Sequence, residues 1–169
     1  CSGDGTREAV LGFDDDRLVY LDTGERLSMT DNWKFAIGRA RGDYVLFVGD
    51  DDAILPGALD RLEPWLAAGR ASILTWPLMF YRWPMDGAPA RASGASAGAG
   101  SVAGAIDMRR RAGCAMRMGS WRHYEVPTIY HSAFHRSLVD AIRDRAGRVF
   151  HTMAPDVFAG FAAAAITAS

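Results

Sequence analysis

Three consecutive carboxylates end a short apolar run in the stretch Gly42-Asp43-Tyr44-Val45-Leu46-Phe47-Val48-Gly49-Asp50-Asp51-Asp52-Ala53-Ile54-Leu55-Pro56. Residues 44–48 are aromatic, β-branched or leucine without polar alternation, which is typical of a strand buried on both faces in a parallel α/β sheet. Asp50, Asp51 and Asp52 then lie at the carboxyl end of that strand, the edge where open α/β sheets bind ligands. The stretch therefore predicts an α/β fold with a ligand site at this edge.

The three aspartates predict a cation site, because adjacent carboxylates repel one another unless a cation or solvent neutralises them. Hard oxygen ligands on a short turn suit Mg²⁺ or Mn²⁺ that bridges to a phosphate. The alternative is a solvated acidic turn before the helix that begins at Pro56, since carboxylates near a helix N-terminus are favourable for electrostatic reasons alone.

The residues around the carboxylates form a wider pattern, which consists of Asn32, Ala36, Ala40, Gly42-Asp43-Tyr44, Asp50 to Asp52, Pro56, Gly57 and Leu59. This pattern resembles the signature of family 2 glycosyltransferases with the GT-A fold. In that signature a helix leads through Gly-Asp/Glu-Tyr into a strand, an Asp-x-Asp motif and a proline-initiated helix. The resemblance implies a Rossmann-like fold with a mostly parallel central sheet and helices on both faces.

The resemblance also implies a reaction, the transfer of a sugar from a nucleoside diphosphate sugar to an acceptor hydroxyl with inversion. Mn²⁺ or Mg²⁺ would be held by Asp52 and Asp50, and Asp50 or Asp51 would help through water or the donor ribose. Such an ion neutralises charge on the departing diphosphate. The acceptor would be a saccharide or a lipid-linked molecule, and the setting would be cell-surface polysaccharide biosynthesis.

Asp156 is the candidate general base, because the family places an acidic residue at the start of a helix downstream of the acceptor loop. The segment His151-Thr152-Met153-Ala154-Pro155-Asp156-Val157 resembles that point. The alternative role is a helix-start carboxylate stabilised by the helix dipole. Glu125 is the reserve candidate for the base.

The first eight residues, Cys1-Ser2-Gly3-Asp4-Gly5-Thr6-Arg7-Glu8, resemble the tail of the family's turn after its second strand. The resemblance implies that Asp4 belongs to the donor site and that the family's first strand lies upstream of this sequence. We therefore interpret the sequence as an N-terminally truncated, single catalytic domain over residues 1–169. Because a missing strand exposes the edges of its neighbours, we expect the 169 residues alone to be prone to aggregation.

Composition places the chain in an ordinary globular class. Its 169 residues suit one domain, and 19 basic against 20 acidic residues give a net charge of −1, which does not indicate a nucleic-acid partner. Two cysteines form no disulfide framework, which favours a reduced, cytoplasmic setting. No apolar run reaches the roughly 18 to 20 residues of a membrane span. We expect a cytoplasmic protein that associates with membranes only at their periphery.

The remaining elements are predicted from periodicity and turn residues. An apolar stripe of Trp33, Ala36, Ile37 and Ala40 predicts a helix closed by Gly42. Further helices are predicted over 135–146 and 155–168, and strands over 18–21, 71–81, 126–131 and 149–152. The Gly-, Ala- and Ser-rich residues 86–106 predict a flexible loop within the domain, either an active-site lid or an inert insertion.

Two weaker patterns remain open. Arg109-Arg110-Arg111, with Arg117 and Arg122 nearby, could bind diphosphate, but helical periodicity favours a solvated basic face. His131 and His135 have the i, i+4 spacing of metal ligands, but a strand-to-helix boundary between them argues against ligation.

Two other functions compete with sugar transfer. A nucleotidyltransferase also carries a metal-bearing acidic pair at a strand end, although its glycine-rich phosphate loop is not visible in this sequence. A non-catalytic, truncated nucleotide-sugar-binding domain is the alternative outside the enzymes.

Overall fold

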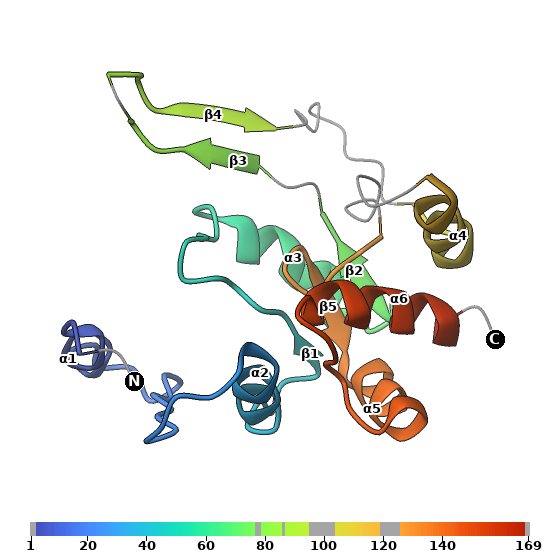
Figure 1. Ribbon diagram of the computed structural model, residues 1–169, viewed down its shortest axis with the longest axis horizontal. Coiled ribbons are helices and arrows are strands. Elements are labelled where there is room, and N and C mark those ends of the chain that lie inside the picture. Colours follow the sequence, from blue (N-terminus) through green and yellow to red (C-terminus); the bar gives the residue numbers. More distant parts are fainter. Residues whose placement is uncertain (1–2, 77–78, 86, 95–103, 119–125, 168–169) are drawn as a thin grey trace.

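The computed structural model describes residues 3–76, 79–85, 87–94, 104–118 and 126–167 (Figure 1). Helices and strands follow one another along the chain in the order α1 (Thr6–Leu11), α2 (Met29–Ile37), β1 (Tyr44–Val45), α3 (Ala58–Ala67), β2 (Ile73–Thr75), β3 (Met79–Arg82), β4 (Arg91–Gly94), α4 (Met108–Met118), β5 (Ser132–His135), α5 (Arg136–Ala146) and α6 (Pro155–Thr167). None of the helices in this part of the chain has the length and apolarity that a membrane crossing requires.

A three-stranded sheet in the order β1-β5-β2 lies at the centre of the molecule. β5 is antiparallel to both neighbours, pairing Tyr44 with His135 on one side and Leu74 with Ala133 on the other. β1 and β2 therefore run in the same direction on either side of a reversed strand. The expected mostly parallel sheet is wrong for the described residues, because the strand between β1 and β2 arrives from the opposite end of the sheet.

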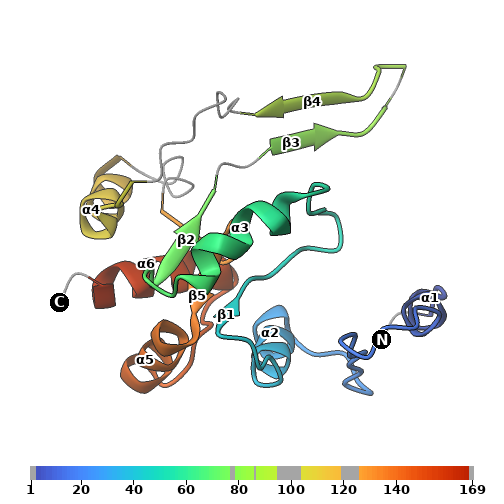
Figure 2. The same cartoon turned by 180° about the vertical axis from the view of Figure 1, so that it is seen from behind.

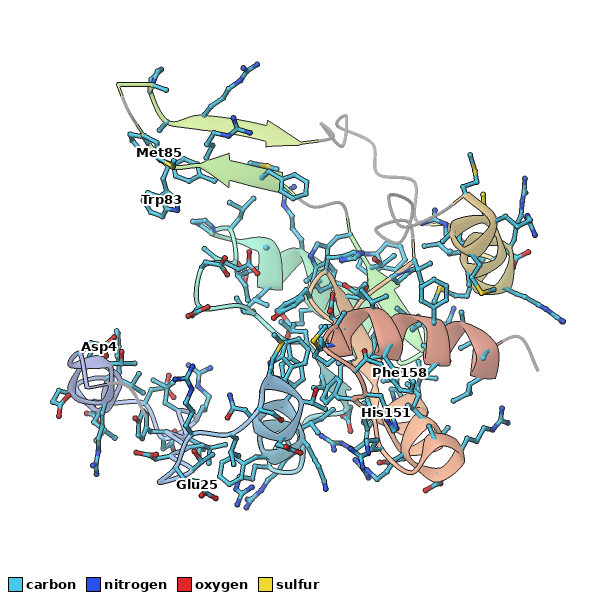
Figure 3. The ribbon with its side chains drawn as sticks, viewed as in Figure 1. Asp4, Glu25, Trp83, Met85, His151 and Phe158 are labelled. Carbon is cyan, nitrogen blue, oxygen red and sulfur yellow. The ribbon has the colours of Figure 1, made fainter. Side chains whose placement is uncertain are left out.

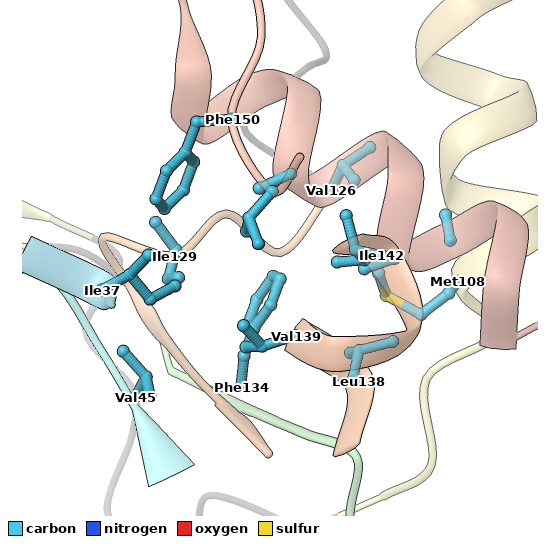
Figure 4. Close-up of a cluster of buried hydrophobic side chains, with 14 of the residues drawn as sticks. Ile37, Val45, Met108, Val126, Ile129, Phe134, Leu138, Val139, Ile142 and Phe150 are labelled. Carbon is cyan, nitrogen blue, oxygen red and sulfur yellow. The ribbon is translucent and has the colours of Figure 1, made fainter. Parts of the chain in front are cut away.

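The core forms where α2, α5 and α6 pack against this sheet (Figures 1 and 2). Phe134 of β5, Val139 and Ile142 of α5, and Ile129 are fully buried, and Phe150 is nearly so (Figure 4). The predicted helices over 135–146 and 155–168 are confirmed as α5 and α6 to within one residue at each end. Trp33 and Ile37 are the buried residues of α2, as the apolar stripe predicts, but the helix ends at Ile37 with Gly38 as its C-cap, so the predicted end at Gly42 is wrong.

Five predicted strands differ from the structure. Of the strand predicted over 71–81, Ile73–Thr75 forms β2 of the central sheet and Met79 begins β3 of another sheet. Residues 18–21 and 149–152 form no strand among the described residues, and the strand expected over 44–48 is assigned only at Tyr44–Val45. Residues 126–131 form a buried turn, and the strand begins at Ser132 instead. Pro127 supplies the reason for this shift, since it has no N–H to donate to a ladder. The His131 N–H donates to the Thr128 carbonyl over 3.3 Å and closes the turn.

β3 and β4 form a separate two-stranded ribbon that projects from the body (Figures 1 and 2). The ribbon corrects the prediction of a structureless loop at residues 87–94; Asp86 and residues 95–103 of that loop lie outside the described residues. With this ribbon and α1 extending outward, the chain exposes 12461 Å². A compact monomer of 18.3 kDa would expose about 8,100 Å². The structure therefore carries an unusual amount of uncovered surface.

Candidate functional site

The acidic turn, which we define as Gly49 to Asp52, comes after β1 in the chain, separated from it by residues 46–48. The N–H of Phe47 donates to the Ile129 carbonyl over 3.1 Å. Beyond β1 the chain therefore still lies beside the segment that leads into β5. The N–H of Asp52 then donates to the Gly49 carbonyl over 3.2 Å and closes the turn. These two hydrogen bonds fix where the three carboxylates begin.

The carboxylates of Asp51 and Asp52 converge above Gly49. A methyl group built on Gly49 would lie 2.8 Å from Oδ1 of Asp51 and 2.9 Å from Oδ2 of Asp52. Both oxygens thus lie within 3 Å of the position that a Cβ atom of residue 49 would take. Asp50, Asp51 and Asp52 are all exposed. Neighbouring carboxylates on one short turn repel each other, and a cation bound by both would relieve that repulsion.

This donor set fits a hard divalent cation that is shared with a substrate. Mg²⁺ usually binds to one or two carboxylates together with substrate phosphates and water, rather than to a cage made by the protein alone. Within the described ranges no group of three or more His, Cys, Asp or Glu side chains could enclose a metal. Asp51 and Asp52 would therefore supply only part of the metal's coordination shell, and a phosphate ligand could occupy the positions that remain.

Tyr130 connects the acidic turn to the start of α6. Its ring is half-buried and lies edge-on against Trp33, with ring centroids 5.0 Å apart. Burial raises the pKa of its phenol above 10.0, and the negative charges of Asp156 and then of Asp52, Asp51 and Asp50 raise it further. The phenol is therefore within electrostatic reach of four of the predicted site carboxylates, Asp50, Asp51, Asp52 and Asp156. It remains a neutral hydrogen-bond donor at neutral pH.

Asp156 lies in the first turn of α6, directly after the buried Pro155. Its side chain is half-buried, at a helix end whose free N–H groups favour a negative charge. Asp156 also acts on His131: burial lowers the pKa of this imidazole, and the carboxylate of Asp156 partly opposes that change. The charge of Asp156 thus acts on both Tyr130 and His131.

Hydrogen bonds hold the segment that carries Tyr130 and His131 in place. Nδ1 of His131 lies 3.1 Å from Oγ1 of Thr128, and its carbonyl accepts from the Trp76 N–H at 3.2 Å and from the Thr75 hydroxyl at 3.1 Å. His135 instead directs Nδ1 at the Ser137 hydroxyl, 2.7 Å away, and caps α5. Each histidine therefore has its own local partner, in agreement with the sequence argument against ligation by the pair.

Asp4 has local hydrogen-bond partners. Its Oδ1 accepts from the N–H and the hydroxyl of Thr6, and Asp4 lies apart from His151 and Phe158 (Figure 3). These hydrogen bonds lower the pKa of Asp4. Its role in the donor site stays a prediction. Glu125, the reserve base, lies outside the described residues.

The basic cluster lies on α4. Its first-turn residues Arg109, Arg110 and Arg111 are exposed, whereas Met108, Ala112 and Ala115 form the buried face of the helix. This alternation is that of a solvated basic face, as the periodicity favoured. Arg122 falls in the part of the chain that the structure does not describe.

Sequence analysis did not single out Tyr130. A lone tyrosine in a short apolar segment carries no local signal of function, and its neighbours Asp52 and Asp156 are far away along the chain. The packing of α6 against residues 126–131 brings Asp156 near, and the hydrogen bond from Phe47 to Ile129 holds the chain that leads to Asp52 beside the same segment. In the α6 contact a methyl group on Gly160 would lie 2.8 Å from the Pro127 carbonyl oxygen.

Comparison with known proteins gives one match. The family model described as glycosyl transferase family 2 matches residues 1–90, just over half of the chain. The matched part includes α1, the acidic turn and β3, and it ends before α6. No curated protein and no solved structure matches the chain significantly.

Proposed function

This chain belongs to glycosyl transferase family 2, and from that membership we propose that it moves a sugar from a nucleoside diphosphate sugar to an acceptor hydroxyl, on a GT-A fold. The observation that carries the proposal is the convergence of Asp51 and Asp52 above Gly49, inside the part of the chain that the family model matches. The proposed acceptor is a saccharide or a lipid-linked molecule.

Asp52 is the proposed metal ligand, with Asp51 or Asp50 as the second oxygen donor. The geometry favours Asp51, since its Oδ1 and Oδ2 of Asp52 lie near the same point. When bound, Mn²⁺ or Mg²⁺ would neutralise the charge that develops on the departing diphosphate. The turn itself orients these carboxylates through the hydrogen bond between the Asp52 N–H and the Gly49 carbonyl.

Asp156 is the proposed general base, which accepts the proton of the acceptor hydroxyl as that oxygen attacks the anomeric carbon. Its carboxylate lies in the first turn of α6. The charge of this carboxylate and the charges of the acidic turn all raise the pKa of Tyr130. The neutral phenol of Tyr130 is suited to donate a hydrogen bond to an oxygen of the donor or the acceptor. With a single base, the acceptor oxygen displaces the diphosphate in one step. One displacement inverts the configuration at the anomeric carbon.

The test measures release of nucleoside diphosphate from a panel of nucleotide sugars, with a saccharide acceptor, in Mn²⁺ or in EDTA. We expect turnover only with the metal, and a loss of about 10²-fold or more in Asp52→Asn, the scale seen when an electrostatic contact to the transition state is removed. Asp16→Asn is the matched control, since Asp16 is exposed and belongs to the acidic run 14–16 outside the proposed site.

Two results would contradict the proposal. If Asp52→Asn and Asp16→Asn lose the same activity, the acidic turn has no special role in catalysis. If the protein binds nucleotide sugars but never releases a nucleoside diphosphate in any metal, the chain is a binding domain rather than a transferase.

A further inference from the structure

The β3–β4 ribbon carries a cluster of large, exposed apolar side chains. Its exposed residues are Met79, Phe80, Tyr81, Trp83 and Met85, each more than half exposed. Trp83 and Met85 lie at the end of the ribbon that is farther from the three-stranded sheet (Figure 3). Nothing in the proposed transfer reaction uses them.

One face of the ribbon is apolar. Side chains alternate along a strand, so Met79, Tyr81 and Trp83 point to the same side. The rings of Tyr81 and Trp83 confirm this, because they meet edge-on with centroids 5.1 Å apart. Ala92 stands opposite Tyr81 on β4 and belongs to this face as well.

The other face carries the exposed ring of Phe80 and two like charges in direct opposition. Arg82 pairs with Arg91 across the ribbon, and among the described residues neither guanidinium has a carboxylate partner. Like charges directly opposite each other destabilise a strand pair. Asp86, the acidic residue of the ribbon sequence, lies outside the described residues, and the sequence 79–94 still has a net charge of +1. An external anion would relieve the repulsion between the two arginines.

An isolated two-stranded ribbon is also only marginally stable in water. β3 pairs with β4, and neither joins the three-stranded sheet. A ribbon with this composition therefore needs a partner that accepts apolar side chains on one face and basic groups beside Phe80 on the other. The interface of an anionic bilayer meets both requirements, because tyrosine and tryptophan favour the headgroup level and arginine binds lipid phosphates.

We propose that the β3–β4 ribbon binds the surface of an anionic membrane. The apolar face of Met79, Tyr81 and Trp83 enters the boundary between headgroups and acyl chains, and Arg82 and Arg91 lie at the level of the phosphates. This depth matches the shallow insertion of amphipathic interfacial elements, about 5–10 Å. The proposal is independent of the transfer reaction.

The test is co-sedimentation of the protein with vesicles of phosphatidylcholine, with or without phosphatidylglycerol. We expect binding to the mixed vesicles and little binding to pure phosphatidylcholine. The double variant Arg82→Gln/Arg91→Gln should bind the mixed vesicles roughly 20- to 30-fold more weakly, since each basic residue contributes about fivefold near an anionic surface. The double variant Tyr81→Ser/Trp83→Ser should lose at least tenfold.

The matched controls change similar residues elsewhere. Trp65 of α3 is 53% exposed, and Trp65→Ser should bind as the wild type does. Arg61→Gln/Arg70→Gln removes the same number of charges outside the ribbon. Circular dichroism and the thermal midpoint of unfolding check that each variant folds. We expect the ribbon variants to fold, because the ribbon lies outside the core.

Two outcomes would overturn the proposal. If both ribbon variants bind mixed vesicles as tightly as the controls, the ribbon is not the membrane contact. If the wild type forms a dimer without vesicles, and Tyr81→Ser/Trp83→Ser abolishes that dimer, the apolar face binds a second copy of this chain instead.

Discussion

The N–H of Phe47 donates to the carbonyl of Ile129, 3.1 Å away, just beyond the paired part of β1. This hydrogen bond holds the chain that leads into the acidic turn beside the segment that carries Tyr130. The ring of Phe47 also stacks on Trp33 of α2, with centroids 4.7 Å apart. The acidic turn is therefore anchored to the core only a few residues before its carboxylates reach solvent.

Gly49→Ala should reduce metal-dependent transfer while leaving the fold intact. The added methyl group would meet Asp51 Oδ1 at 2.8 Å and Asp52 Oδ2 at 2.9 Å, so both carboxylates must move. A displacement of about 1 Å in a reacting group costs up to about 10²-fold in rate. Transfer rate and Mn²⁺ dependence are the measurements.

Gly104→Ala is the control for this change, since a methyl group there meets nothing within 4 Å. Because the clashing atoms at Gly49 belong to exposed side chains, the thermal midpoints of both variants should stay near that of the wild type. Full activity in Gly49→Ala would show that the convergence of the two carboxylates has no part in catalysis.

Asp156→Asn should lower kcat by about 10²- to 10⁴-fold, the usual contribution of a general base. The amide is nearly isosteric with the carboxylate but cannot accept the proton of the acceptor hydroxyl. Affinity for nucleoside diphosphate with Mn²⁺ should change little, which separates loss of the base from loss of the donor site. Asp144→Asn, at an exposed position on α5, is the matched control, and an equal decline in both variants would refute the assignment.

Because His131 is buried, the protein should be less stable in mild acid than at neutral pH. The pKa of His131 is lowered from 6.5 by burial, so below pH 6.5 the unfolded chain takes up the proton more readily than the folded one. The stability that the neutral imidazole contributes is therefore lost as the pH falls below 6.5. In Asp156→Asn the opposing carboxylate is gone, and the pKa of His131 should fall further. An NMR titration of the imidazole checks this; a pKa that does not move would separate Asp156 from His131.

Two glycine substitutions should have opposite effects on stability. A methyl group on Gly160 of α6 would lie 2.8 Å from the backbone carbonyl oxygen of Pro127 and 3.3 Å from Val126, in a buried contact. Gly160→Ala should destabilise the protein by about 1–3 kcal/mol, as overpacking does. On α4 the same change at Gly113 meets only Arg117 at 3.5 Å, and Gly113→Ala should stabilise by up to about 1 kcal/mol. Urea unfolding of both variants measures the difference.

Local signals in the sequence predicted the helices well. The stripe that contains Trp33 and Ile37 gave the buried face of α2, and Gly147, at φ 75°, ends α5 where a left-handed residue is required. The acidic turn was predictable as well, because an apolar run that stops at three aspartates is visible without any tertiary information.

The sheet was less predictable, because strand pairing depends on segments far apart in the sequence. The run over 18–21 has suitable residues for a strand, but no described segment pairs with it. The direction of β5 relative to β1 also leaves no local trace. For the same reason Tyr130 was missed: its importance comes from Asp52 and Asp156, which only the folded chain brings near it.

The pKa of Tyr130 tests most directly whether the acidic turn and Asp156 form one site. The pKa is measured by following tyrosinate absorbance in the ultraviolet as the pH rises. The curve of Tyr130→Phe is subtracted from that of the wild type. Since burial and then the charges of Asp156 and the acidic turn raise this pKa above 10.0, we predict that it falls in Asp156→Asn and also in the triple variant Asp50→Asn/Asp51→Asn/Asp52→Asn. A pKa that stays unchanged in both would show that the carboxylates do not share one site around Tyr130.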